Sequence, residues 1–96
     1  MSSIHRDYIQ IPEASGRFWC VDTAFIEEEE LYETMVFDAV KMPENSPYIF
    51  DVDYSSCNDF VVTSSIDEAY ENHRNMIVKW STINRKEGTN YGQRAD

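Results

Sequence analysis

The alternation of hydrophobic and polar residues predicts a series of short strands followed by one helix. Runs rich in aromatic and β-branched residues at 17–26, 31–38 and 60–63 are typical of strands, although the leucine, methionine and glutamate of 31–38 also allow a helix there. The most regular alternation lies at residues 48–54, which also predict a strand. There Tyr48, Phe50, Val52 and Tyr54 share one side, and Ile49, Asp51 and Asp53 share the other.

A helix is predicted to begin at Ser65. Ser65 is a suitable N-cap, Glu68 stands at the capping-box position, and Asp67 lies in the first turn. Gly88 is the expected stop. Apolar residues recur at spacings of three and four, which places them on one face: Ile66, Ala69, Tyr70, Met76, Ile77, Trp80 and Ile83.

These elements predict an α+β fold, an antiparallel sheet of about four strands with one long C-terminal helix packed on one face. Residues 1–16 are expected to form an N-terminal arm or a short strand, residues 17–84 a single α+β domain, and residues 85–96 a flexible polar tail. We expect the helix to cover the aromatic side of the sheet. The opposite side and the loops would then hold the carboxylates.

Charge narrows the range of functions. The 96 residues carry a formal net charge of −10, and residues 22–59 hold 11 acids against one base, Lys41. Such acidity argues against direct binding of nucleic acid or an anionic membrane. No apolar run reaches the length of a membrane span and no signal peptide is evident, so we expect a cytoplasmic protein.

The acids of this central segment are the candidate partner-binding residues. A dense anionic surface favours association with a basic protein and makes that association sensitive to salt. The alternative is a solvated face that only keeps a small protein in solution. The residues predicted to bind a partner are Glu27, Glu28, Glu29, Glu30, Glu33, Asp51, Asp53 and Asp59.

Motifs for catalysis or metal binding are weak. Asp51 and Asp53 form a bare DxD without a phosphate-binding loop, and no cysteine or histidine spacing matches a zinc site. His73 falls within the apolar stripe, which favours a buried neutral imidazole hydrogen-bonded to the sheet. Cys20 is expected to be buried and Cys57 exposed. We therefore predict no catalytic residue, no cofactor and no metal ligand.

Two segments resemble small uncharacterised proteins of bacteriophages and prophages. The ETMVF strand at residues 33–37 matches in full, and the helix opening matches at Ser65, Glu68, Ala69 and His73. Asn72 replaces the glycine that usually precedes the histidine, Val62 stands where tyrosine is common, and the acidic run at 27–30 replaces a more glycine-rich loop. The resemblance spans about residues 18–80 and implies a viral accessory protein, in the host cytoplasm, without assigning an activity.

The function expected from these observations is non-enzymatic binding of a basic host protein. A nucleic-acid-binding defence protein is one such target, inhibited in the manner of an anti-CRISPR protein or a nucleic-acid mimic. The alternatives are a minor virion or assembly protein, or a homodimer paired through a strand edge. A small-molecule-binding protein or an enzyme ranks below these.

Overall fold

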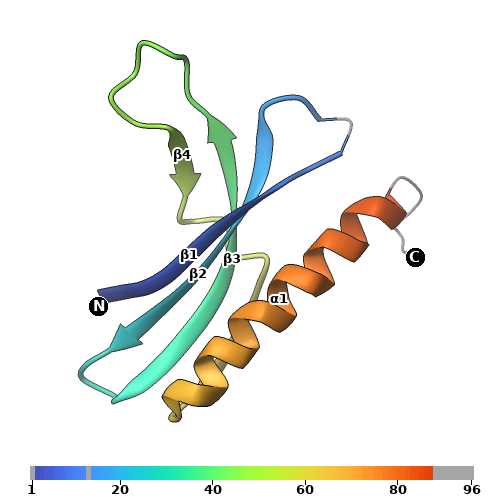
Figure 1. The fold of residues 1–96 in the computed structure, drawn as a ribbon. Helices are drawn as coiled ribbons and strands as arrows, with labels where there is room; N and C mark the ends of the chain where they lie inside the picture. Colours follow the sequence, from blue (N-terminus) through green and yellow to red (C-terminus); the bar gives the residue numbers. More distant parts are fainter. Residues whose placement is uncertain (1, 13, 88–96) are drawn as a thin grey trace.

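The computed structural model describes residues 2–12 and 14–87 and contains five strands followed by one helix (Figure 1). This confirms the predicted α+β fold. The elements are β1 (Ser2–Gln10), β2 (Arg17–Ile26), β3 (Leu31–Lys41), β4 (Phe50–Asp53), β5 (Asp59–Thr63) and α1 (Ile66–Glu87).

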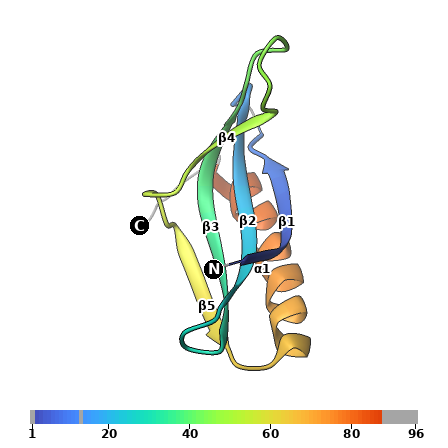
Figure 2. The same cartoon turned by 90° about the vertical axis from the view of Figure 1, so that its left-hand side faces the viewer.

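All neighbouring strands pair antiparallel, in the order β1-β2-β3-β4, and β5 also pairs with β3. β4 pairs with residues 38–41 of β3, and β5 pairs with residues 32–36. Two short strands therefore follow each other along β3, as seen in Figure 2, where the strands lie side by side in front of the helix.

The helix packs across one face of the sheet against β1, β2, β3 and β5. We call this the covered face. Val21 and Val36 lie opposite each other on β2 and β3 and are buried together with Met76 of the helix. Trp19 meets Trp80 of the helix with 4.8 Å between ring centroids. In the part of the chain that the structure describes, no helix has the length and apolar character needed to cross a membrane.

Within residues 2–12 and 14–87 no helix lies over the other face, and we call it the uncovered face. It is nevertheless packed, because side chains of the outer strands β1 and β4 meet above β2 and β3. Tyr8 of β1 stacks on Phe50 of β4, with 3.8 Å between ring centroids. Beneath them Cys20 and Phe37 are buried at 0% and 5% exposure.

The expectation about which side the helix covers is therefore wrong. Phe50 and Val52 of β4 lie on the uncovered face, because Val52 pairs with Ala39 and Phe50 stacks on Tyr8. Asp53 pairs with Asp38, and Asp38 pairs with Trp19, so these residues lie on the covered face. Strand pairing decides this arrangement, and the alternation within one strand does not reveal it.

Several predicted boundaries also change. Residues 2–10 form a full strand in the sheet, and the helix continues to Glu87, through the first part of the predicted tail. Of the strand predicted at 48–54 only residues 50–53 pair. The helical residues Ile66 and Tyr70 are exposed, unlike Ala69 and Met76 of the same predicted stripe. Gly88 and the rest of the predicted tail, 88–96, lie outside the described residues.

Candidate functional site

The turn between β2 and β3 presents four consecutive glutamates, Glu27 to Glu30, all exposed. Backbone hydrogen bonds from Glu29 N–H to the Ile26 carbonyl and from Glu30 N–H to the Glu27 carbonyl close the turn. Glu30 adopts a φ of 55°, a left-handed conformation that glycine or asparagine adopts at less cost. Among the described residues none of the four carboxylates has an ion-pair partner.

The start of the helix lies at the same end of the molecule as this turn (Figures 1 and 2). The register explains why: Tyr32, close behind the turn, pairs with Thr63, close before the helix. Two exposed acids of the first helical turn thereby join the glutamates. We call this group the acidic end, comprising Glu27, Glu28, Glu29, Glu30, Asp67 and Glu68.

No lysine or arginine interrupts the acidic end. The segments that form it and border it, residues 2–5, 24–33 and 62–71, contain neither lysine nor arginine. Mutual repulsion among its carboxylates is therefore not relieved by a neighbouring lysine or arginine of these segments, and a field of one sign extends from this end.

The helix start is capped nearly as predicted. The Glu68 backbone N–H donates to Ser65 Oγ at 3.3 Å, the forward arm of a capping box. The return arm differs, since the Glu68 carboxylate accepts a hydrogen bond from the Thr63 hydroxyl at 2.6 Å. Glu68 is thus fixed against the end of β5.

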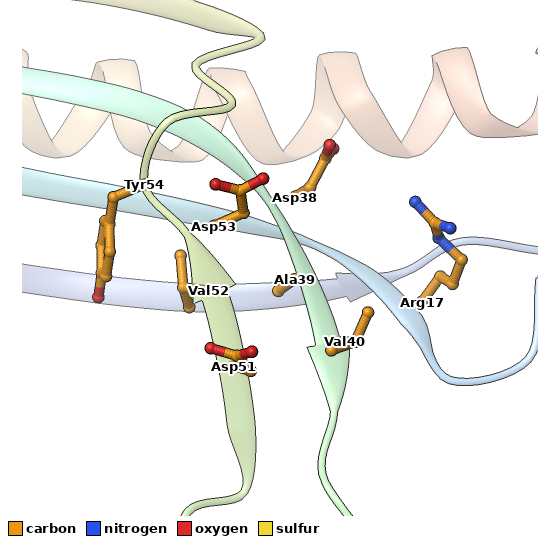
Figure 3. A pocket seen from close by; sticks show the side chains of 8 residues that line it. All are labelled: Arg17, Asp38, Ala39, Val40, Asp51, Val52, Asp53 and Tyr54. Atoms are coloured by element: carbon orange, nitrogen blue, oxygen red, sulfur yellow. The ribbon is translucent and has the colours of Figure 1, made fainter.

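Asp51 and Asp53 lie far from the acidic end, about 30 Å along β3 at the rise of an extended strand. They border a hollow of about 470 Å³ together with Asp38 and Arg17 (Figure 3). In Figure 3 the Asp38, Asp53 and Arg17 side chains point toward the helix side, and the Tyr54 ring points away from it. This second acidic group contains a cation, unlike the acidic end.

The last two predicted binding residues are placed elsewhere. Glu33 is half-buried and lines a cavity on the uncovered face together with Arg6 and Asp22. Asp59 accepts hydrogen bonds from Lys79 Nζ at 2.7 Å and Trp80 Nε1 at 3.0 Å. Partial burial alone would raise the pKa of Asp59, but the bonds from Lys79 and Trp80 lower it. Asp59 thus already has its partners within the chain.

The cavity beside Glu33 is lined by an ion pair of which Asp22 is buried and Arg6 half-buried. Asp22 is 8% exposed and accepts hydrogen bonds from Arg6 Nε at 3.1 Å and from the Ser3 hydroxyl. Although partial burial opposes it, the bond to Asp22 raises the pKa of the Arg6 guanidinium. The Arg6 guanidinium also lies 5.6 Å from the centre of the Tyr54 ring. These polar groups are mutually satisfied, which indicates a structural role.

A chain of hydrogen bonds crosses the covered face between sheet and helix. Thr34 Oγ1 lies 2.7 Å from Thr23 Oγ1, which lies 2.8 Å from His73 Nδ1, and His73 Nε2 lies 2.9 Å from Asp7 Oδ2. The predicted burial of His73 is confirmed, at 2% exposure. Burial lowers the pKa of His73, and the bond to Asp7 opposes that shift.

The order hydroxyl, imidazole, carboxylate resembles a nucleophile activated by a general base. Thr23, however, has 0% exposure, so no substrate reaches its hydroxyl. The geometry at Thr23 therefore supports a satisfied polar network inside the protein. The cysteines also lie as predicted and are unbonded to each other, Cys20 buried and Cys57 exposed.

Sequence reasoning missed two assemblies. The sequence identifies Asp67 and Glu68 as residues of a helix start. It does not place them near Glu27–Glu30, because no local pattern shows that the helix begins at the same end as the β2–β3 turn. His5 and Asp7 lie in a stretch that lacked a clear strand pattern, yet His5 Nε2 stands 3.1 Å from Asp7 Oδ2 and reaches the same oxygen as His73. Alternation of His5, Asp7 and Ile9 was the one available signal.

Comparisons with protein-family models, with curated proteins and with solved structures found no significant match.

Proposed function

We propose that this chain is a non-enzymatic protein that binds a basic surface of another protein through its acidic end. The observation that carries the proposal is that the turn with Glu27–Glu30 and the helix start with Asp67 and Glu68 lie at the same end of the molecule, with no lysine or arginine in the segments around them. Such a surface attracts cationic partners and speeds their association.

The sequence of the turn also supports the proposal, because these residues do not favour the stability of the turn. Four adjacent carboxylates repel one another, and Glu30 occupies a left-handed conformation that favours glycine. A turn chosen for stability would use glycine or asparagine there. Non-glycine residues held in the left-handed region, such as Glu30, cluster at functional sites.

The partner class that fits is a protein with a nucleic-acid-binding surface, since such surfaces concentrate lysine and arginine. Occupation of that surface would inhibit the partner. The resemblance to phage proteins adds a context, in which the target is a host defence protein.

Displacement of an oligonucleotide from basic nucleic-acid-binding proteins of the host tests the proposal. We expect this protein to displace the oligonucleotide at low salt and to lose the effect as salt rises. The double variant Glu28→Gln and Glu29→Gln should weaken displacement. The variant Asp51→Asn and Asp53→Asn removes the same charge elsewhere and should act like the wild type. Displacement that persists at high salt, or that is unchanged in the Glu28/Glu29 variant, would contradict the proposal.

A second candidate function is self-association through β5, the alternative that a strand edge offers. On β5 the uncovered-face residues Phe60 and Val62 are 60% and 41% exposed. Exposed apolar residues on an outer strand favour pairing with another chain. Light scattering distinguishes the candidates: a dimer that Phe60→Ser dissociates would support self-association, and a monomer at high concentration would remove it.

A further inference from the structure

We propose that His5, Asp7 and His73 form a binding site for a divalent transition metal of the zinc type. The inference does not depend on the proposed function. It begins from convergence: both histidines of the chain direct Nε2 at one carboxylate oxygen, Asp7 Oδ2, at 3.1 Å from His5 and 2.9 Å from His73. The three ligand atoms all lie within 4.8 Å of one another.

The donor set fits zinc chemistry. Two imidazole nitrogens and one carboxylate oxygen are the ligands of many zinc sites that keep a further position for water. At zinc bond lengths of about 2.0–2.2 Å, ligand atoms in a tetrahedral site stand about 3.3–3.5 Å apart. The separations of 3.1 and 2.9 Å to Asp7 Oδ2 are thus within a few tenths of an ångström of that spacing.

The ring of His73 is held from behind as a metal-binding histidine requires. Its other nitrogen, Nδ1, lies 2.8 Å from Thr23 Oγ1, and Thr23 in turn meets Thr34. When Nδ1–H donates to Thr23, the Nε2 lone pair points at the Asp7 carboxylate. Such an outer hydrogen bond fixes both the tautomer and the orientation of a metal ligand.

The tautomer of His73 with its proton on Nδ1 would favour a cation between His73 and Asp7. With Nε2 unprotonated, two acceptors face each other at 2.9 Å, an arrangement that a metal ion between them resolves. In the opposite tautomer Nε2–H donates to Asp7, and the same residues form a hydrogen-bonded network only. The two arrangements differ in which nitrogen of His73 carries the proton.

Access is provided from the outer side of β1. The side chains of His5 and Asp7 are 50% and 45% exposed, whereas His73 is 2% exposed. An ion can therefore reach the site from solvent, keep a water molecule, and connect β1 to the helix. The half-exposed His5 ring, in edge contact with His73 at 4.3 Å between centroids, is the ligand free to adjust.

Titration of the metal-free full chain with Co²⁺, and then with Zn²⁺ in competition, tests the site. We expect one Co²⁺ per chain, with the intense visible absorption of four-coordinate cobalt, displaced by Zn²⁺. His5→Ala and Asp7→Asn should each weaken binding by about tenfold or more, given that even outer-sphere changes cost that much. Both positions are half-exposed, and circular dichroism verifies that the variants fold.

Two control variants test whether other side chains of the protein bind the cobalt. Asp51→Asn tests the DxD pair and Cys57→Ser tests the exposed thiol, and both should bind cobalt like the wild type. Nitrogen NMR of the histidines gives a further readout, since Nε2 of both rings should shift on zinc binding while Nδ1 of His73 stays protonated. Absence of saturable cobalt binding, or binding that His5→Ala and Asp7→Asn leave unchanged, would overturn the proposal and leave a hydrogen-bonded network only.

Discussion

The two faces of the sheet are buried by different means. On the covered face, a helix brings Met76 against Val21 and Val36, and a polar chain runs through the interface from Thr34 to Asp7. On the uncovered face the described part of the chain has no helix, and side chains of the outer strands meet there through the stacked rings of Tyr8 and Phe50. The comparison teaches that a small sheet can acquire a second packed layer from its own outer strands.

The difference has consequences for function. The buried polar chain on the covered face, from Thr34 through Thr23 and His73, reaches the surface at Asp7 and His5, where the proposed metal site lies. The acidic end belongs to neither packed face, because it consists of the β2–β3 turn and the first turn of the helix. The surface proposed to bind a partner therefore lies outside both packed faces.

The largest effect is expected from Phe37→Ala on the uncovered face. Phe37 is 5% exposed beside Cys20 and Ala39, so its truncation should lower the free energy of unfolding by about 3–5 kcal/mol. Met76→Ala on the covered face should lower the free energy of unfolding by about 2–5 kcal/mol. Urea unfolding measures both. A loss below about 1 kcal/mol for Phe37→Ala would show that the uncovered face is not a packed layer.

Thr23→Val sharpens the comparison on the covered face. The change preserves shape but leaves His73 Nδ1 and Thr34 Oγ1 without their shared buried partner, so the free energy of unfolding should fall by about 1–3 kcal/mol. Thr82→Val is the control, since this exposed hydroxyl bonds only to its own helix at the Val78 carbonyl. Equal effects of the two changes in urea unfolding would argue against the buried chain.

Asp59 connects β5 to the helix and gives a pH signature. Asp59→Asn should lower the free energy of unfolding by about 1 kcal/mol at pH 7, because the variant loses the charged hydrogen bonds to Lys79 and Trp80. The pKa of Asp59 is lowered below the ordinary 3.8 in the folded state. Its contribution is therefore present above that value and lost as pH falls through the folded-state pKa.

Unfolding measured between neutral and acid pH checks this sign. The difference between the wild type and Asp59→Asn should stay constant down to about pH 5 and shrink below about pH 4. A difference that grows in acid would contradict the lowered pKa.

The smallest effect concerns thiol reactivity and leaves stability unchanged. Burial raises the pKa of Cys20 to about 11, although nearby Arg6 opposes the shift, and Cys20 has 0% exposure on the uncovered face. A thiol reagent should modify Cys57 quickly and reach Cys20 only when the sheet opens. Reaction followed in the native protein and in denaturant measures this. Equal rates for both cysteines in the native protein would mean that the Tyr8–Phe50 closure is open in solution.

The helix and the central strands could be predicted because their signals are local. The helix is predicted by Ser65 and by the spacing of Ala69, His73 and Met76, and β2 is predicted by the aromatic run at 17–26. What the helix covers could not be predicted, because it depends on strand register. The pairing of Asp53 with Asp38 decides the side on which the β4 carboxylates lie.

The candidate sites show the same limit. Glu27–Glu30 are evident in the sequence as a charge run, but Asp67 and Glu68 join them only through the pairing of Tyr32 with Thr63. His5 and His73 lie far apart in the chain and share no motif. His5 lies two residues before Asp7 on β1, and the position of the helix over β1 brings His73 to the same carboxylate.

The most direct test of the central claim compares association rates of two charge-matched variants with one basic partner across a range of salt concentrations. Glu28→Gln with Glu29→Gln should slow association about threefold to tenfold at low salt and flatten its salt dependence. Asp51→Asn with Asp53→Asn should leave both near the wild-type values. Equal slowing by the two variants would contradict a localised acidic end and would mean that only the net charge matters.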